Sequence, residues 1–214
     1  MYVVLDVETK NLGSDIMKDN EQILSIQLGD AIKQELYYDS KDPLWTLAMG
    51  KKRIASLLSQ GHIFAGYNVK KFDIPLLKQF LGVEIPESSI FELSETPKVT
   101  ELNKMKKYRL EEVCAECGID VGHKLKMSEK AEKYKVRQDI KAQADAKAKD
   151  LVKNKGWSLD FALRYVLDKI AGGHAIFDAY LEFVESGGQK NTLFYEYAIG
   201  DVIAEYQLLK ALKY

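Results

Sequence analysis

The amino-acid sequence predicts an α/β fold in which a mixed five-stranded sheet is flanked by helices. Short apolar runs rich in β-branched residues are typical of buried strands, and five such runs occur before residue 94. Loops of turn-forming residues separate the first three, which indicates an antiparallel meander, whereas helical segments separate the last two. With 214 residues and 46% hydrophobic content, the chain can bury one substantial core, so we expect a single domain over residues 1–214.

The expected strands are short and end at turns. The first, YVVLDV, is the most apolar, so it should lie in the middle of the sheet. The loop after it contains the turn-forming residues of segment 11–15. The five expected strands cover residues 2–7, 22–30, 34–39, 62–67 and 89–93.

Capping and stop signals place the helices. Asp42 is a suitable N-cap, Pro43 suits the first helical position, and Gly61 ends the helix that follows. We expect Gly172 and Gly173 to interrupt a later helix. The expected helices cover residues 42–60, 72–81, 110–117, 126–155, 157–184 and 192–212. The helical segment of about 124–186 then forms an insertion between core segments 1–123 and 187–214.

Composition excludes some classes of protein. No apolar run reaches about 18 residues, so we expect no membrane partner. The first residues show no secretory signal, so we expect a cytoplasmic protein. Cys114 and Cys117 lie three positions apart on an expected helix without a second Cys or His pair, which predicts two reduced cysteines, one or both of them buried.

Charge is distributed unevenly along the chain. The net charge is −1, yet residues 124–155 carry 11 Lys and Arg against 5 Asp and Glu. This segment therefore has a charge of +6 and the rest of the chain −7. A basic segment can attract a phosphate backbone, although a solvated helix face would have the same composition.

Two acidic residues at the end of the first strand are the first candidates for a chemical site. Side chains two residues apart on a strand share a face, so Asp6 and Glu8 should point to the same place. The pair alone is weak evidence, because two solvated carboxylates would have the same spacing.

Two further segments supply polar groups. In GYNVKKFDIPLL, Asp73 follows Asn68 and Phe72 where a strand leads into a helix, although Asp73 could be a helix-capping residue and Asn68 a turn former. In YAIGD, Tyr197 and Asp201 are four residues apart and share a helix face. The apolar neighbours of Asp201 would make an unpaired charge costly, so a partner is expected, and a metal ion is a suitable one.

Together these segments resemble the three exonuclease motifs of the DnaQ-like (DEDD) 3′–5′ exonuclease superfamily, which has a ribonuclease H-like fold. The motifs LDVET, GYNVKKFDIPLL and YAIGD are most similar to those of the proofreading domains of family B DNA polymerases, and the tyrosine indicates the DEDDy subclass. The resemblance spans residues 2–118 and 190–214. It does not cover the helical segment at 124–186.

The resemblance implies a role for each motif residue. Asp6, Glu8 and Asp201 would bind one divalent ion, and Asp6 with Asp73 would bind a second. Tyr197 would orient the attacking water. Asn68 and Phe72 would shape the substrate cleft, and the main chain near Thr9 would contact the terminal nucleotide.

The implied cofactors are two Mg²⁺ or Mn²⁺ ions, which prefer oxygen ligands and stabilise both the attacking and the leaving oxygen of a phosphodiester. A competing motif, His174 with Asp178, is spaced four apart instead of the five of the histidine subclass, so we do not expect it to form the site. His62 and His123 are expected to be structural or surface residues.

The basic segment offers two further hypotheses. Its cations could contact the phosphates of a single strand, with the ring of Tyr134 available for stacking. Alternatively, the apolar stripe at 159–170 could form the interface of a homo-oligomer. The candidate phosphate contacts are Lys124, Lys126, Lys130, Lys133, Lys135 and Arg137.

The sequence thus predicts a metal-dependent 3′–5′ exonuclease that releases nucleoside monophosphates from single-stranded DNA, and that a replication or repair protein could recruit. Trimming of RNA is a close alternative, because no residue in the motifs tests for a 2′-hydroxyl. A nucleic-acid-binding protein of the same fold without catalysis is the competing class.

Overall fold

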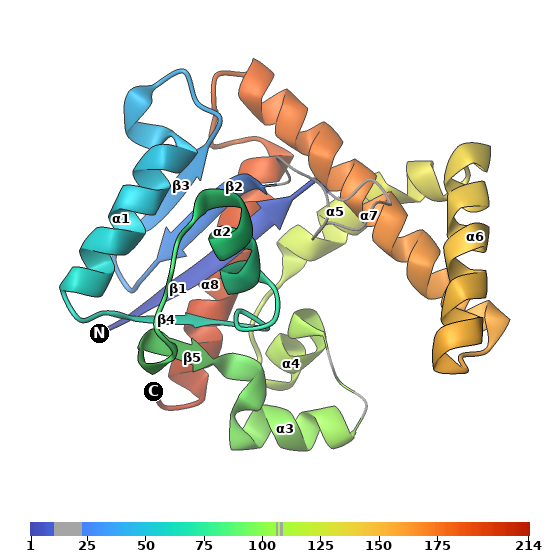
Figure 1. Ribbon diagram of the computed structural model, residues 1–214, viewed down its shortest axis with the longest axis horizontal. Helices are drawn as coiled ribbons and strands as arrows, with labels where there is room; N and C mark the ends of the chain where they lie inside the picture. The colour runs from blue at the N-terminus through green and yellow to red at the C-terminus, as the bar shows by residue number, and fades with distance from the viewer. Residues whose placement is uncertain (11–22, 106, 108) are drawn as a thin grey trace.

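The fold is built on a mixed sheet, and the computed structural model describes residues 1–10, 23–105, 107 and 109–214 (Figure 1). Within this part of the chain the strand order is β3-β2-β1-β4-β5. β2 is antiparallel to both β1 and β3, whereas β4 and β5 continue the sheet from β1 in parallel. The strands are β1 (Tyr2–Thr9), β2 (Ile23–Gly29), β3 (Gln34–Tyr38), β4 (Ile63–Gly66) and β5 (Ile90–Glu92). The predicted α/β class, five-stranded mixed sheet and N-terminal meander are confirmed.

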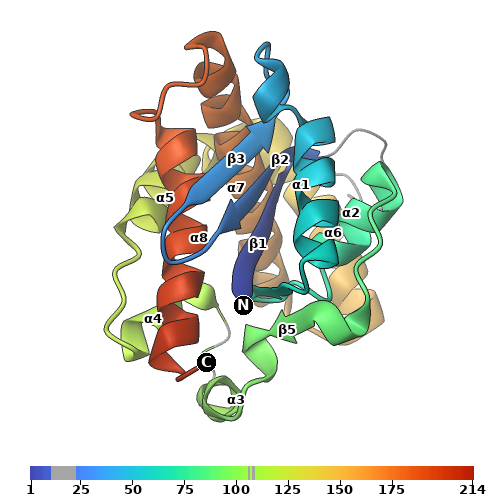
Figure 2. The ribbon, with the colours of Figure 1, turned by 90° about the vertical axis from the view of Figure 1, so that its left-hand side faces the viewer.

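Helices cover both faces of the sheet (Figure 2). On one face, α1 and α2 bury an apolar cluster that includes Ile54, Leu76 and Phe64. On the other face, α8 crosses β1, β2 and β3. The helices are α1 (Leu47–Ser59), α2 (Asp73–Leu81), α3 (Pro97–Lys104), α4 (Leu110–Glu116), α5 (Gly122–Lys135), α6 (Gln138–Lys155), α7 (Leu159–Glu185) and α8 (Leu193–Ala211).

Near residue 42 the structure differs from the prediction. Asp42 accepts a hydrogen bond from the backbone N–H of Leu44 and caps a short 3-10 turn, and α1 begins later, capped by Thr46. α3 was not expected from the sequence; it begins with Pro97 at its first position. The predicted loop at 11–15 lies outside the described residues.

The helical segment also differs from the prediction in two places. The expected helix 126–155 is two helices, because Arg137 has an extended backbone and α6 turns back to pack along α7. Conversely, α7 continues through Gly172 and Gly173. Tertiary packing on both sides of these glycines outweighs their low helix propensity.

This helical segment shares a core with the sheet. Met127, Val166 and Ile170 pack in one cluster with Leu36 of β3. Val166 and Ile170 of the apolar stripe of α7 are thus buried within the chain, whereas Leu159 at its start is 47% exposed. Homo-oligomerisation stays an untested prediction.

No helix in the described part of the chain combines the length and the apolarity that a membrane crossing requires. Cys114 and Cys117 are free cysteines at the end of α4, and Cys114 is buried, as predicted.

Candidate metal centre

Asp6 and Glu8 lie on one face of β1, at the end where this strand loses a neighbour. β1 pairs with β4 only as far as Val4, although its pairing with β2 continues to Thr9. The two carboxylates meet that of Asp201, which projects from α8. One ligand oxygen from each of the three residues lies within 4.8 Å of the other two. The structure therefore brings these three predicted residues together.

Asp73 lies beside β1, beyond the point where the pairing of β1 with β4 ends. The chain turns at Asn68, which has a left-handed backbone with φ of 65°, and α2 then begins at Asp73. Asp73 Oδ1 accepts a hydrogen bond of 2.9 Å from the backbone N–H of Val7. Burial, followed by the charge of Asp6, raises the pKa of Asp73 well above its ordinary value. Asp73 is thus a buried neighbour of the cluster, outside the group of three.

Asp201 has two partners from the start of α5. His123 Nε2 and Lys124 Nζ lie 2.8 and 2.7 Å from Asp201 Oδ1. Burial raises the pKa of Asp201, but the ammonium of Lys124 and the hydrogen bond to His123 outweigh it, so the net pKa lies below its ordinary value. Of the two roles predicted for His123, the structure excludes that of a surface residue, because its side chain is only 11% exposed and contacts Asp201. Lys124, predicted as a phosphate contact, is bound to a carboxylate of the cluster.

The other two carboxyls of the group have raised pKa values. Burial, and then the charge of Asp201, raises the pKa of Asp6 to about 7. Burial and the charges of Asp6 and Asp201 raise that of Glu8 well above its ordinary value. Like charges in a buried site cannot all ionise without compensation, so these groups retain protons near neutral pH.

Tyr197 lies one helical turn before Asp201 on α8 and lines the same cleft. Lys124 Nζ is 5.1 Å from the centre of its ring. Burial raises the pKa of its phenol well above the ordinary value; Lys124 opposes this, and the charges of Glu8 and Asp201 add to it. The phenol therefore stays neutral at physiological pH and can donate a hydrogen bond.

The structure adds a fifth carboxylate, Glu205, which the sequence reasoning missed. Glu205 is one turn after Asp201 on α8 and only 3% exposed. Its Oε2 has no hydrogen-bond partner among the described residues. Burial, and then the charges of Asp6 and Asp73, raises its pKa well above the ordinary value. The signal was present: an acid four residues from Asp201 on an apolar helix face needs a partner for the same reason.

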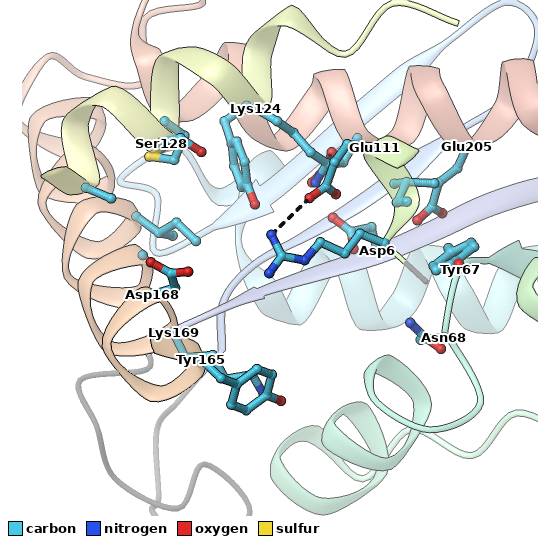
Figure 3. Close-up of a pocket in the computed structure, with 18 of the residues that line it drawn as sticks. Asp6, Tyr67, Asn68, Glu111, Lys124, Ser128, Tyr165, Asp168, Lys169 and Glu205 are labelled. Carbon is cyan, nitrogen blue, oxygen red and sulfur yellow. Dashed lines mark hydrogen bonds and ion pairs between the residues drawn. The ribbon is translucent and has the colours of Figure 1, made fainter. Parts of the chain in front are cut away.

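Asp6, Lys124, Tyr197, Asp201 and Glu205 line a cleft of about 720 Å³ between the sheet and the helical segment. Figure 3 shows Glu205, Tyr67 and Asn68 at one end, Asp6 in the middle, and Tyr165 and Lys169 projecting from α7 at the other. Arg109 and Glu111 approach the cleft from α4. Three of the carboxylates, those of Asp6, Asp201 and Glu205, thus line the cleft.

The residues predicted to shape the substrate cleft or to contact the terminal nucleotide differ in their exposure to solvent. Asn68 lines the cleft and is exposed, and Phe72 is 39% exposed at the start of α2. The side chain of Thr9 is buried at the end of β1. Their contacts with a substrate stay predictions.

Most of the predicted phosphate-binding cations are already paired within the chain. Lys126, Lys130 and Lys133 bind carboxylates of α7 and α8. Exposed ion pairs are weak and exchange readily, so phosphate contacts by these lysines stay a prediction. Arg137 pairs with Asp139 on the surface, and Lys135 lines the cleft while pairing with Asp168.

The prediction that the ring of Tyr134 is available for stacking on a base is wrong. The side chain is buried in the shared core and stacks on His174, with ring centres 5.3 Å apart. Asp178, the other member of the competing motif, pairs with Lys133; this hydrogen bond lowers its pKa to about 2 in spite of partial burial. The His174 and Asp178 pair is thus part of the helix packing and lies outside the carboxylate group of three.

The donor set fits divalent cations. Asp6, Glu8, Asp73, Asp201 and Glu205 supply carboxylate oxygens against one buried ammonium, and Mg²⁺ and Mn²⁺ prefer such ligands. Asp6 Oδ2 is buried without a hydrogen-bond partner among the described residues, as is Glu205 Oε2. Ionising buried carboxyl groups of this kind is costly unless a cation compensates the negative charge.

Comparison with known proteins identifies no family for this chain. No protein-family model matches the sequence, and no curated protein matches it.

Proposed function

We propose that this protein is a metal-dependent 3′–5′ exonuclease of ribonuclease H-like fold that hydrolyses single-stranded nucleic acid, preferentially DNA. The observation that carries the proposal is the meeting of Asp6, Glu8 and Asp201 within 4.8 Å, beside a cleft that Asp6 and Asp201 line. The strand order and directions of the sheet are compatible with this fold. The preference for DNA rests on the similarity of the three motifs to those of polymerase proofreading domains.

The roles of the chain's own groups follow from their positions. Asp6, Glu8 and Asp201 would hold one ion, and Asp6 and Asp73 a second. When bound, such ions activate a water for attack on phosphorus and stabilise the charge on the leaving oxygen. The hydrogen bond from Val7 keeps the carboxylate of Asp73 in place beside β1.

Tyr197 and Lys124 would act on the substrate side of the site. The neutral phenol of Tyr197 can donate a hydrogen bond that orients the attacking water. Lys124 is the best placed of the predicted phosphate contacts, because its ammonium lies in the cleft and its pKa is raised by Tyr197 and Asp201 in spite of burial. It supplies positive charge where a phosphate would approach.

The test is degradation of 5′-labelled oligonucleotides, single- and double-stranded, DNA and RNA, with Mg²⁺, Mn²⁺ or a chelator. We expect a ladder that shortens from the 3′ end of single strands and disappears with the chelator. Asp6→Asn and Asp201→Asn should lower the rate by at least about 100-fold, since loss of even an outer-shell partner costs roughly 10- to 100-fold. Asp150→Asn, an exposed acid on α6, is the matched control.

Three results would discriminate among the candidate functions. Faster loss of RNA than of DNA would transfer the proposal to an exoribonuclease. Binding of oligonucleotides without any hydrolysis would support a non-catalytic binding protein. Full activity of Asp6→Asn would exclude this cluster as the catalytic site.

A further inference from the structure

One face of α7 continues the cleft away from the carboxylates. Ile176, Gly172, Lys169 and Tyr165 line the cleft at successive turns of this helix. Phe161 is four residues before Tyr165 and therefore lies on the same face, one turn farther out. This row of side chains, here called the α7 track, leads from the metal centre to the surface.

The packing around position 172 does not require a glycine. Gly172 lies in the interior of a 27-residue helix, where glycine destabilises relative to alanine. A methyl group at this position would meet no atom of the described protein within 4 Å, because the position faces the open cleft. The missing side chain instead keeps the wall of the cleft clear beside the metal centre.

Aromatic rings cluster at the outer end of the track. The ring of Trp157 lies edge-on against Phe161 and Tyr165, with centres 5.0 and 5.2 Å apart. Phe161 is 50% exposed, and Tyr165 is half-buried in the cleft lining. The cluster therefore presents ring surface both to solvent and to the cleft.

Two lysines flank these rings without a carboxylate partner. Lys169 Nζ is 5.0 Å from the ring centre of Tyr165, and Lys155 Nζ is 5.4 Å from that of Trp157. Neither takes part in an ion pair found among the described residues. Lys126, Lys130 and Lys133 on the neighbouring α5, in contrast, are paired with acids. Positive charge without an ion-pair partner among the described residues thus lies beside the aromatic rings.

We propose that the α7 track binds the single strand of nucleic acid upstream of its 3′ end. Tyr165 and Phe161 would stack on bases, Lys169 would contact a phosphate, and the strand would pass over Gly172. Aromatic rings interleaved with cations are the arrangement that binds single strands without sequence preference. A second copy of this chain fits less well, because a symmetric interface would bring the lysines of both copies together. The proposal rests on the proposed exonuclease function.

Binding is measured separately from catalysis. Fluorescence anisotropy in EDTA, with labelled single strands of about 15 nucleotides, spans the site sizes of such grooves. We expect Tyr165→Ala and Phe161→Ala each to raise Kd by roughly tenfold. Lys169→Ala should raise Kd and reduce the salt slope by about one. DNA and RNA strands should both show the effect, and blunt duplex DNA should bind more weakly.

Tyr206 and Lys210 provide the matched controls. They form the same pair four residues apart on α8, with Lys210 Nζ 5.7 Å from the ring centre, and neither is among the residues that line the cleft. Tyr206→Ala and Lys210→Ala should therefore leave Kd within about twofold, the scale of error in such comparisons.

Two substitutions of Gly172 test its role. One is measured by thermal stability and the other by strand binding. Gly172→Ala should raise Tm, because it removes the helix cost of glycine without a clash. Gly172→Leu should place a side chain in the cleft and raise Kd by roughly tenfold or more while the protein stays folded. A structural role for Gly172 would instead lower Tm in both variants.

The outcomes separate the track from the proposed function. Wild-type affinity of Tyr165→Ala, Lys169→Ala and Gly172→Leu would overturn the track, as would failure of the wild-type protein to bind single strands. The p-nitrophenyl ester of thymidine 5′-monophosphate, which reaches only the metal centre, tests catalysis by the wild-type protein. If the wild-type protein hydrolyses this ester and the variants bind single strands normally, the α7 track is refuted and the exonuclease is not. If the variants bind single strands more weakly and the wild-type protein does not hydrolyse the ester, the exonuclease is refuted and the track is not.

Discussion

Replacing Asp6 by asparagine should stabilise the metal-free protein at alkaline pH and have little effect in acid. Burial, and then the charge of Asp201, raises the pKa of Asp6 from 3.8 to about 7. The folded protein therefore binds the proton more tightly than the unfolded chain, and its stability falls as the pH rises from 3.8 through 7. The difference between the two pKa values corresponds to a loss of about 4 kcal/mol in the free energy of unfolding at pH 8. This loss vanishes below pH 3.8, where both states are protonated.

The neutral amide of Asp6→Asn does not ionise, so the variant does not lose this stability as the pH rises. For a chain of this size about 1 kcal/mol shifts Tm by roughly 2–4 °C, so Tm of the variant should exceed that of the wild type by about 10 °C at pH 8. Thermal unfolding is followed by circular dichroism in EDTA from pH 4 to pH 8. Asp150→Asn, on the exposed face of α6, should show no such pH dependence. A gain that is constant with pH, or a loss of stability at pH 8, would refute the reasoning.

Three further perturbations test the centre. Saturating Mn²⁺ should raise Tm of the wild type, and more at pH 8 than at pH 6, since the ligands must lose their protons; an unchanged melting curve would exclude the site. Gly200→Ala would place Cβ 2.5 Å from Cγ of His123 and push this ring from Asp201, which should lower nuclease activity and Tm; unaltered values of both would contradict the contact. Glu205→Gln should weaken Mn²⁺ binding by roughly tenfold in calorimetry, and unchanged affinity would assign Glu205 to packing alone.

Short-range periodicity accounts for the parts of the fold and site that could be predicted. Alternation at two residues along a strand places Asp6 and Glu8 on one face, and a spacing of four on a helix does the same for Tyr197 and Asp201. Both relations depend only on local geometry, so they hold in the folded protein. The five strands were found for the same reason.

Long-range packing accounts for the errors. The segment around Arg137 has good helix formers on both sides, and the break between α5 and α6 exists because α6 packs back along α7. Gly172 and Gly173 lower helix propensity, yet α7 continues, since neighbouring elements hold it along its length. Tyr134 belongs to a basic segment in the sequence and to the apolar core in the structure.

The sequence by itself determined which residue types could form a metal centre and which strand or helix carries each one. Only the tertiary structure decided what compensates Asp201, because His123 and Lys124 are about 80 residues away along the chain and reach it only when α5 packs on α8. The same packing buries Glu205 beside Asp6 and forms the cleft along α7. Periodicity reports the direction of a side chain on its own element, whereas the electrostatic environment of a buried carboxylate depends on every element that packs around it.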